Sequence, residues 1–423
     1  MKILFCCQFY APSVGGVQEL IKQLSENFVR RGHDVTVATT VLADRKSTEL
    51  SGVHIREFNI QGNWVTGMSG EVALYQQFVV DAEFDVMLVY AAQQWTFDAL
   101  WPVLEDIPYP VVFAPCGFSG LYERGYAEYF KALAEQLNKI DFFIFNASQY
   151  RDVEFILSRG DFRHTVIPNA ANEKEFNIVP AQDFRENMGI LENSFVFLTV
   201  GSLTGMKGHE EVVAAFERMN LDKHAHSTLI LNGNSIRSSG DGFSFRRKLL
   251  GVFKTYGFIG GCRHIFQKLK KSDQSLKSHV ARVNAQQNNK KILMVNLERD
   301  QLIQAFFSAD LFVFASKIEH SPLVLFESAA ARLPFLSVDV GNAKEIAEWT
   351  GAGVICPSER DERGYTQVDV DVLARHMAQW MEQSDERKKM GETGRKRWFE
   401  YYTWEHVSLQ YERVFRQVME MEI

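Results

Sequence analysis

Residues 311–327 read LFVFASKIEHSPLVLFE, and they carry the strongest structural signal in the chain. The apolar run Leu311–Ala315 predicts a buried strand, and Leu323–Ala331 predicts a helix after a short polar loop. We expect Ser321 to be the N-cap of this helix and Pro322 its first residue, because these residue types are favoured there. A buried strand that leads through a loop into a helix is the repeating unit of α/β folds with a parallel sheet.

Two glutamates flank the start of this predicted helix. We expect Glu319 in the loop and Glu327 on the helix, both near the carboxyl end of the strand, where α/β folds bind ligands. The helix start offers free N–H groups and the positive end of its dipole to an anion. Two carboxylates beside an anion site suit a ligand that combines hydroxyl groups with phosphate. The alternative is a capping carboxylate plus a solvated helix glutamate.

The alternation of short apolar runs and helical patterns continues on both sides of this stretch. Strands are predicted at Ile3–Phe9, Val35–Thr39, Val53–Phe58, Val86–Tyr90, Val111–Ala114, Phe142–Phe145, Thr165–Ile167, Phe195–Val200, Thr228–Leu231, Ile292–Val295 and Phe335–Val338. Helices are predicted at Val17–Val29, His209–Arg218 and Gln301–Phe307, among other places. Short apolar strands separated by helices indicate βαβ units and a parallel sheet.

The segment from Pro168 to Asn193 interrupts this alternation and is rich in Asn, Pro and Glu, which indicates a domain boundary. We expect an N-terminal Rossmann-like domain over residues 1–175 and a second one over residues 176–395. Residues 396–423 would form a C-terminal helix, running from Trp398 to Met419, that covers another surface. Two doubly wound domains that face each other create a cleft, with ligands at the carboxyl ends of the strands.

Composition excludes several classes of protein. Of the 423 residues, 46% are hydrophobic and 23% are charged, the mix of an ordinary soluble globular protein and not of a disordered, collagen-like or coiled-coil chain. No run of 18 apolar residues occurs, so no spanning helix is predicted. The five cysteines form no C-x-x-C pair, which argues against a disulfide framework or zinc site and favours a cytoplasmic protein.

A strongly basic segment lies within an otherwise acidic chain. Residues 236–291 contain 13 Lys and Arg against 2 Asp and Glu, whereas the whole chain has a net charge of −7. Such a block favours a local anionic partner over general nucleic-acid binding. We interpret it as an insertion of short cationic amphipathic helices that lies on an anionic membrane surface. The alternative is that its apolar face packs on the second domain.

Two further loops follow predicted strands. The stretch Gly201–His209 contains three glycines and Lys207, a combination that can bind phosphates through backbone amides and a point charge. The stretch Ala11–Val17 contains Gly15 and Gly16 before the first helix, which permits close backbone approach. Neither stretch has the Walker or the dinucleotide-binding pattern, and each alone could be a surface turn.

No metal site is predicted. Asp369-Val370-Asp371 has the D-x-D spacing of metal-dependent sugar transferases, but it directly precedes a predicted helix over Val372–Met381. We therefore interpret it as a capping cluster. The histidines are scattered and lack paired-ligand spacing.

Together these features resemble the retaining GT-B glycosyltransferases of the family 4 type, over nearly the whole chain and in the same order. Glu319 and Glu327 match the E-x7-E motif of that family, which is its most specific element. The weaker matches are Gly15-Gly16, Arg31–Val35, Ile167–Ala170, Lys207-Gly208, Val338–Gly341, Glu345-Ile346 and Thr403–Glu405. The resemblance implies a GT-B fold with an N-terminal acceptor domain and a C-terminal nucleotide-sugar domain.

The resemblance also implies roles for single residues. Glu327 would hold the ribose hydroxyls of a UDP- or GDP-sugar, and Glu319 would hold hydroxyls of the donor sugar near the reacting carbon. The diphosphate would be bound by Lys207, the Gly16 amide and the amides around Leu323 and Val324. Lys207 and Glu319 would thus be the catalytic residues, through stabilisation of leaving-group charge. No metal or other cofactor is implied.

The chain departs from the family pattern at three places. Ser202 stands where the family often has a phosphate-binding Arg, so Lys207 would carry more of that charge. Cys116-Gly117 stands on the acceptor side with Gly15, where many members have His-Gly. Arg332 replaces a common Gly after the second glutamate. These departures leave open a catalytically impaired protein that binds nucleotide-sugars, or another GT-B reaction such as epimerisation or phosphorolysis.

The predicted function is retaining transfer of a sugar from a nucleotide-sugar to a glycan or lipid-linked glycan, in bacterial surface polysaccharide or glycoconjugate synthesis. The protein would be a hexosyltransferase that works in the cytoplasm or on the cytoplasmic face of the membrane, with residues 236–291 facing the lipid.

Overall fold

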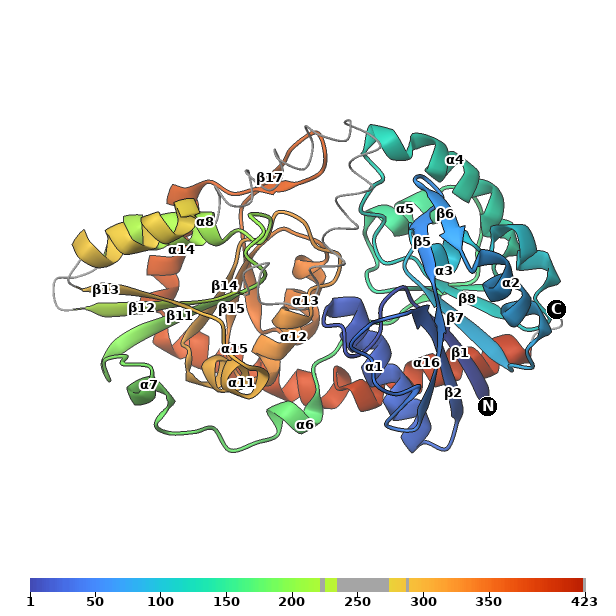
Figure 1. The fold of residues 1–423 in the computed structure, drawn as a ribbon. Coiled ribbons are helices and arrows are strands. Elements are labelled where there is room, and N and C mark those ends of the chain that lie inside the picture. The colour runs from blue at the N-terminus through green and yellow to red at the C-terminus, as the bar shows by residue number, and fades with distance from the viewer. Residues whose placement is uncertain (221–224, 234–273, 287–288, 421–423) are drawn as a thin grey trace. The chain divides into compact units, whose positions relative to one another are not determined.

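The computed structural model describes residues 1–220, 225–233, 274–286 and 289–420. The chain divides into two compact units. The first contains Met1–Asn169 and Trp404–Ile423, and the second contains Ala170–Thr403. Each unit is an α/β fold built on a parallel sheet, which confirms the predicted fold class (Figure 1).

The second unit is built on a six-stranded sheet in which every neighbouring pair is parallel. Its strands are β11 (Ser194–Val200), β12 (His226–Asn232), β13 (Lys290–Val295), β14 (Leu311–Phe314), β15 (Phe335–Val338) and β16 (Gly353–Cys356). They lie in the order β13-β12-β11-β14-β15-β16. The order reverses between β11 and β14, and in doubly wound sheets this switch point is where ligands bind.

Helices cover this sheet. They are α6 (Glu173–Phe176), α7 (Phe184–Asn187), α8 (His209–Arg218), residues 274–286, α11 (Arg299–Ser308), α12 (Leu323–Ala330), α13 (Ala343–Thr350), α14 (Val370–Glu382) and α15 (Ser384–Tyr401). A small hairpin is formed by β17 (Glu359–Arg360) and β18 (Thr366–Gln367). The central strands β11, β14 and β15 are buried on both faces, and their sequences are nearly continuous apolar runs without alternation.

The first unit is built on an eight-stranded sheet in the order β10-β9-β8-β7-β1-β2-β4-β3. These strands are β1 (Lys2–Cys6), β2 (Asp34–Thr40), β3 (Glu49–Leu50), β4 (Val53–Phe58), β7 (Val86–Tyr90), β8 (Val111–Ala114), β9 (Phe142–Phe145) and β10 (His164–Val166). Only β3, at one edge, pairs antiparallel within this sheet. A separate hairpin is formed by β5 (Ile60–Asn63) and β6 (Gly67–Gly70).

The helices of the first unit include one from the far end of the chain. They are α1 (Gly16–Arg30), α2 (Val72–Asp81), α3 (Trp95–Asp98), α4 (Ala127–Gln136), α5 (Arg151–Leu157) and α16 (Trp404–Met419), with the 3-10 turns η1 (Trp101–Asp106), η2 (Arg124–Tyr126) and η3 (Leu137–Lys139). The helix α16 packs beside α1 (Figure 1). There the rings of Phe28 and Phe415 stack with their centroids 5.5 Å apart.

Two predicted boundaries are wrong. The continuous helix over Trp398–Met419 is broken at Tyr402 and Thr403, so that Trp398 belongs to α15. The break is fixed by the chain at Ala171, whose N–H donates to Tyr402 O at 3.1 Å and which bridges to Thr403. The first strand ends at Cys6 and not at Phe9.

The start of α12 also differs from the expectation. Pro322 occupies the N-cap position, Leu323 is the first helical residue, and no side chain caps this end. Ser321 is therefore not the N-cap. The capping role of Asp369 is confirmed, because its side chain accepts hydrogen bonds from the N–H groups of Asp371 and Val372.

Part of the basic segment packs on its own protein. Leu276, Val280 and Val283, on one face of the helix over residues 274–286, are buried in the core of the second unit. On its polar side, His279 and Arg282 contact the carboxylate of Glu217 at 2.9 and 2.6 Å. This end of the segment thus follows the packing alternative. The proposed membrane-facing residues 236–273 lie outside the described residues.

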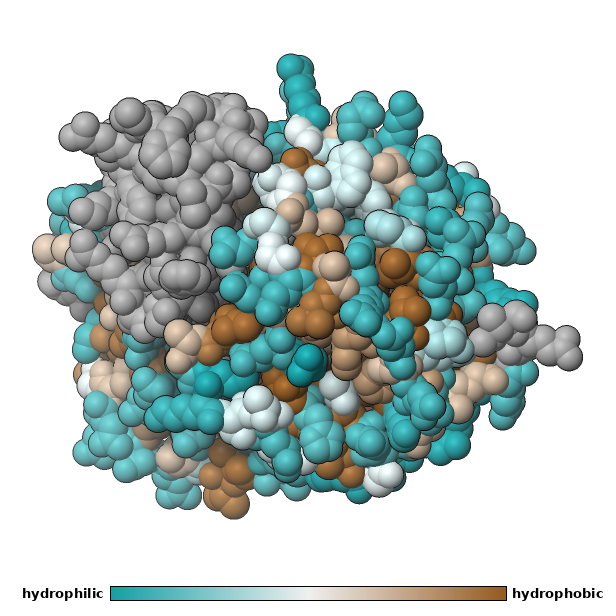
Figure 2. Space-filling model, turned by 45° about the vertical axis from the view of Figure 1, so that its right-hand side comes forward, coloured by the Kyte–Doolittle hydropathy of each residue, from teal (hydrophilic) through white to brown (hydrophobic). Residues whose placement is uncertain are grey.

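The described helices include none that is both long and apolar enough to cross a membrane. On the face drawn in Figure 2, hydrophilic residues are interspersed with hydrophobic ones over the described surface. Exposed apolar side chains are normal in this arrangement, since polar groups cannot cover the whole surface of a folded protein.

Candidate functional site

The switch point of the second unit brings together two of the predicted loops. The loop after β11 carries Lys207, and the loop after β14 carries Glu319. Lys207 Nζ lies 2.5 Å from Glu319 Oε1, with side chains 29% and 15% exposed. Ser316 Oγ donates a hydrogen bond to the same oxygen at 2.8 Å. A partly buried carboxylate therefore has a cation and a hydroxyl among its partners at the place where doubly wound sheets bind ligands.

Glycine permits the close approach of these two loops. Gly208 has a left-handed φ of +72°, and a Cβ there would lie 1.8 Å from the carbonyl oxygen of Ala315. The N–H of Lys317 donates to Met206 O at 2.8 Å and fastens the loops together. Because no other residue could adopt this backbone without displacing Ala315, the Lys207-Gly208 pair has a structural reason as well as a chemical one.

A third loop closes against the glutamate loop. Gly341 follows β15 with a φ of +58°, and a Cβ there would lie 2.3 Å from the carbonyl oxygen of His320. The same carbonyl accepts a hydrogen bond from the N–H of Asn342 at 2.9 Å. The backbone on either side of Glu319 is thus held by both neighbouring loops of the sheet.

The helix α12 begins directly after this loop and carries the second glutamate. Leu323 and Val324 form its first turn, where N–H groups have no partner within the helix. Glu327 lies one turn further and is 8% exposed. Its Oε1 lies 2.6 Å from Arg299 Nη2. The structure thus places Glu319, Glu327 and the start of α12 on one loop–helix segment, beside Lys207.

The remaining predicted donor-side residues are Ser202 and Gly16, and Gly15 is predicted on the acceptor side. Ser202 lies exposed in the loop after β11. Gly15 and Gly16 lie in the first unit, where Gly15 is the N-cap of α1 and Gly16 its first residue. A Cβ at Gly16 would meet no other atom within 4 Å, so packing does not require glycine at this position.

The predicted acceptor-side residues lie in a loop with unusual backbone geometry. Cys116, Gly117 and Phe118 follow β8 with φ values of 60°, 86° and 45°. The N–H of Gly117 donates to Asp152 Oδ2, which is fully buried, at 2.8 Å. Burial, and then the nearby Asp152, raise the pKa of the Cys116 thiol to about 12, although the residue as a whole is partly exposed. Cys116 therefore stays protonated and is a poor nucleophile at neutral pH.

Sequence reasoning missed several residues of the second unit. His209, at the start of α8, is buried, and its Nε2 lies 3.0 Å from the carbonyl oxygen of Gly201. Burial lowers the pKa of His209, so it stays neutral and closes the Lys207 loop. Ser316 and Arg299 were also missed, because each acts on a glutamate that only the fold brings near. The one available signal was the position of His209 directly after Lys207-Gly208.

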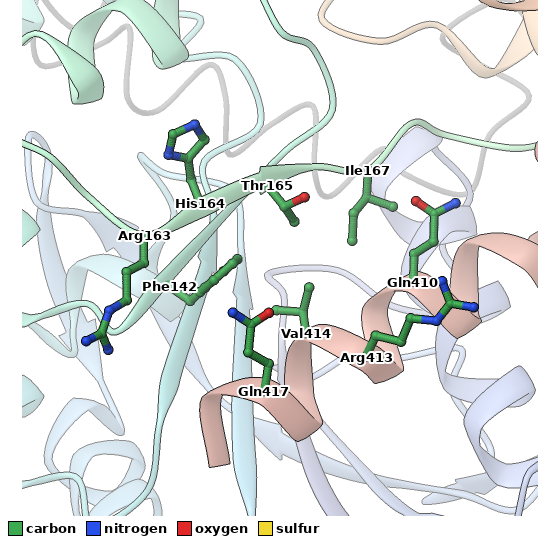
Figure 3. A pocket seen from close by; sticks show the side chains of 9 residues that line it. All are labelled: Phe142, Arg163, His164, Thr165, Ile167, Gln410, Arg413, Val414 and Gln417. Carbon is green, nitrogen blue, oxygen red and sulfur yellow. The ribbon is translucent and has the colours of Figure 1, made fainter. Parts of the chain in front are cut away.

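The first unit has a pocket that is lined by none of the site residues described above. Its volume is ≈ 560 Å³, and it lies between α16 and the β9–β10 edge of the sheet (Figure 3). Phe142 and Val414 line it from opposite sides, with Arg163 and Arg413 among its polar residues. None of the predicted site residues lines this pocket. Within the described ranges, no group of three or more His, Cys, Asp or Glu residues could hold a metal ion.

Two relatives match the chain over nearly its full length. An uncharacterized glycosyltransferase of Methanocaldococcus jannaschii is 22% identical over 100% of this chain and 99% of its own. The N-acetyl-alpha-D-glucosaminyl L-malate synthase of Bacillus anthracis is 20% identical over 96% of this chain and 95% of its own.

A solved structure shares the fold. HepE of Anabaena, crystallised in complex with UDP and glucose, superposes with a TM-score of 0.66 at 16% identity, over 99% of this chain and 100% of its own. A model of the family described as glycosyl transferases group 1 matches residues 181–397, just over half of the 423 residues. This matched region contains the Lys207–Glu319 pair, Glu327 and the whole six-stranded sheet, and by this match the chain belongs to the glycosyl transferases group 1 family.

Proposed function

We propose that this glycosyltransferase moves a sugar, with retention of anomeric configuration, from a UDP- or GDP-sugar to a glycan or lipid-linked glycan. The observation that carries the proposal is the pair Lys207–Glu319 at the switch point, 2.5 Å apart, with Glu327 on the following helix. A cation, two carboxylates and a helix start match a ligand that has a diphosphate between two sets of hydroxyl groups.

Each side chain has a task in this proposal. Lys207 and the first N–H groups of α12 bind the diphosphate and stabilise the charge that develops as it leaves. Glu319 accepts hydrogen bonds from hydroxyls of the donor sugar, and Glu327 accepts them from the ribose. The Lys207–Glu319 ion pair holds both side chains at the switch point.

The reaction balances without a further reactant. The bond between the anomeric carbon and the diphosphate oxygen breaks, and a bond from that carbon to the acceptor oxygen forms on the same face. The departing phosphate oxygen takes the proton of the acceptor hydroxyl. No step in this scheme requires Cys116, which agrees with its raised pKa.

The relatives support a nucleotide-sugar as the donor. The crystallised HepE binds UDP and glucose, and the Bacillus anthracis relative is named for an N-acetylglucosaminyl product. A lipid-linked acceptor in bacterial surface polysaccharide synthesis is the part of the proposal that rests on the basic segment alone.

Two experiments test the function in sequence. A thermal-shift panel of UDP-, GDP- and ADP-sugars identifies the donor, since a ligand that binds only the folded state raises the melting temperature. Product analysis with that donor, labelled in the sugar, then distinguishes an α- or β-glycoside from an epimer or a sugar phosphate. An inverted glycoside would contradict retention, and binding without any product would favour a catalytically impaired protein.

A further inference from the structure

Arg299 connects Glu327, the predicted ribose-binding glutamate, to the short helix α6. It begins α11, and its Nη2 lies 2.6 Å from Glu327 Oε1 on α12. The same nitrogen lies 2.5 Å from Glu175 Oε2 on α6, and Nε donates to that oxygen at 3.2 Å. The helices α6, α11 and α12 lie together in the second unit (Figure 1).

The three side chains differ in burial, and Glu327 is the most buried of them. The Glu327 side chain is 11% exposed, whereas Arg299 is 40% and Glu175 is 26% exposed. A carboxylate that is nearly buried needs a cation or hydrogen-bond donors to stay charged. Arg299 supplies the cation, and Glu175 holds the same guanidinium through Nε and Nη2. The guanidinium also lies 5.8 Å from the centre of the Phe176 ring, which adds a cation–π contact.

The arrangement leaves Glu327 able to bind a ligand. Its Oε2 has no hydrogen bond within the described part of the chain, and Oε1 uses one of its two lone-pair directions for Arg299. An ionised carboxylate accepts hydrogen bonds only, so its natural partners are hydroxyl donors. The Arg299 contact holds Oε1 in place and leaves Oε2 as an acceptor.

The helix α6 is itself anchored, which makes the contact a rigid one. The carbonyl of Phe176 accepts a hydrogen bond from Arg395 Nη1 at 2.9 Å, and Trp398 Nε1 donates to Ala171 O at 3.2 Å. The side chain of Asn172 caps the start of α6. Glu175 is therefore a fixed point against which Arg299 can orient Glu327.

We propose that Arg299 is a positioning residue for nucleotide recognition: held by Glu175, it orients the Glu327 carboxylate toward the ribose hydroxyls. This inference rests on the proposed function, because it takes the ligand to be a nucleoside diphosphate. Arg299 itself does not touch the ligand. Its loss should therefore weaken ribose recognition without weakening diphosphate recognition.

A comparison of ribo- and deoxyribonucleotides tests this by calorimetry. UDP or GDP is used, whichever raises the wild-type melting temperature more, together with its 2′-deoxy form and inorganic pyrophosphate. The ratio of the Kd for the deoxy form to the Kd for the ribo form reports recognition of the 2′-hydroxyl. A general loss of structure would weaken all three ligands and leave that ratio unchanged.

The expected pattern is specific to each variant. Glu327→Gln should bring the ratio close to one. Arg299→Gln should weaken the ribonucleotide about fivefold, lower the ratio, and leave pyrophosphate binding unchanged. Glu175→Gln should have a smaller effect of the same kind, and the double variant should be no worse than Arg299→Gln alone. Arg299→Lys should recover part of the ratio, because it keeps the charge but loses the planar fork.

Arg218→Gln is the matched control. It removes an exposed arginine whose Nη1 lies 3.0 Å from Asp371 Oδ1, away from the switch point, and it should change none of the three affinities. The proposal is overturned if Arg299→Gln keeps the wild-type ratio while Glu327→Gln loses it. Tighter nucleotide binding by Arg299→Gln would also overturn it, because Arg299 would then be blocking the carboxylate.

Failure of the proposed function gives a different result. If wild type does not discriminate against the deoxynucleotide, or if Glu327→Gln discriminates as wild type does, then Glu327 does not bind ribose and the role of Arg299 falls with it. If neither nucleotide binds at all, a nucleotide-sugar donor is contradicted.

Discussion

Glu319 Oε1 accepts hydrogen bonds from both Lys207 Nζ, at 2.5 Å, and Ser316 Oγ, at 2.8 Å. The two residues proposed for catalysis are therefore partners of each other. A diphosphate must compete with Glu319 for the ammonium group of Lys207. Removal of Lys207 and removal of the Glu319 charge should therefore change nucleotide affinity in opposite directions.

Replacement of Lys207 should strongly reduce transfer. Lys207→Ala removes the cation that binds the diphosphate, and exposed Ser202 cannot supply a charge in its place. We expect a loss of about 2–4 kcal/mol in transition-state stabilisation, measured as kcat/KM for the donor. Lys317→Ala is the control, since its ammonium group pairs instead with Glu211 at 2.7 Å. Near-normal turnover by Lys207→Ala would refute the diphosphate role.

Replacement of Glu319 should separate binding from turnover. Glu319→Gln keeps the size of the side chain but removes the charge that competes for Lys207. We expect nucleoside diphosphate to bind at least as tightly as to wild type, while kcat falls because a hydroxyl acceptor near the reacting carbon is lost. Calorimetry with the nucleotide and steady-state kinetics measure the two effects. Weaker nucleotide binding with unchanged kcat would show that the role of Glu319 has been misassigned.

Replacement of Glu327 should weaken nucleotide binding more than it reduces turnover. Glu327→Ala removes the proposed ribose contact and also leaves Arg299 with Glu175 as its remaining carboxylate partner. We expect chiefly a weaker Kd for the nucleotide and a higher KM for the donor, with a smaller change in kcat. The same two measurements apply. A larger loss in kcat than in affinity would require the roles of the two glutamates to be exchanged.

The sequence predicted most of the fold because buried parallel strands are continuous apolar runs. The bounds of β4, β7, β8, β9 and β15 and of α8 agree to the residue. The break between α15 and α16 could not be predicted, since it depends on Ala171, more than 200 positions earlier, pairing with Tyr402 and Thr403. Local sequence patterns show which side chains are apolar. They do not show which distant backbone segment interrupts a helix.

Local sequence patterns also explain which residues of the candidate site could be singled out in advance. Lys207, Glu319 and Glu327 stand out because each follows a strand and a loop of recognisable composition. Arg299 follows β13, at the far edge of the sheet in the strand order, and only the packing of α11 and α12 against α6 brings it to Glu327. A partner such as Arg299, which lies on a helix that follows a distant strand, leaves no spacing pattern in the sequence.

The C-terminal helix should be held to the first unit by a pH-dependent contact. Glu412 of α16 contacts Arg31 at 2.6 Å and Arg416 at 2.7 Å. Burial alone would raise the pKa of Glu412, but the hydrogen bonds from Arg416 and Arg31 lower it to about 2. Because the folded pKa lies below the ordinary value of 4.5, the stabilisation is complete above that pH and is lost as the pH falls toward 2.

Glu412→Gln should remove this contribution. We expect the free energy of unfolding at pH 7 to fall by about 2 kcal/mol, and its decline between pH 4.5 and pH 2 to become shallower than in wild type. Urea titrations at several pH values measure both effects. Glu420→Gln, at an exposed position just beyond α16, is the control. An unchanged acid dependence in Glu412→Gln would show that this contact does not stabilise the fold.

The basic segment should bind anionic lipid if the proposed acceptor is lipid-linked. Residues 274–286 already pack on the second unit, so the membrane-facing charges must come from the preceding part of the segment. Changing Arg246, Arg247, Lys248, Lys270 and Lys271 together to Gln removes five positive charges, each worth about 1 kcal/mol near an anionic surface.

We expect wild type to float with phosphatidylserine vesicles at low salt and the variant to remain unbound. A control variant with three exposed lysines outside the segment, Lys388, Lys389 and Lys396 of α15, changed to Gln should float as wild type does. If wild type ignores the vesicles, or if the five-residue variant floats equally well, the membrane role is refuted while the diphosphate and ribose assignments stand, because they depend only on residues at the switch point and on Arg299.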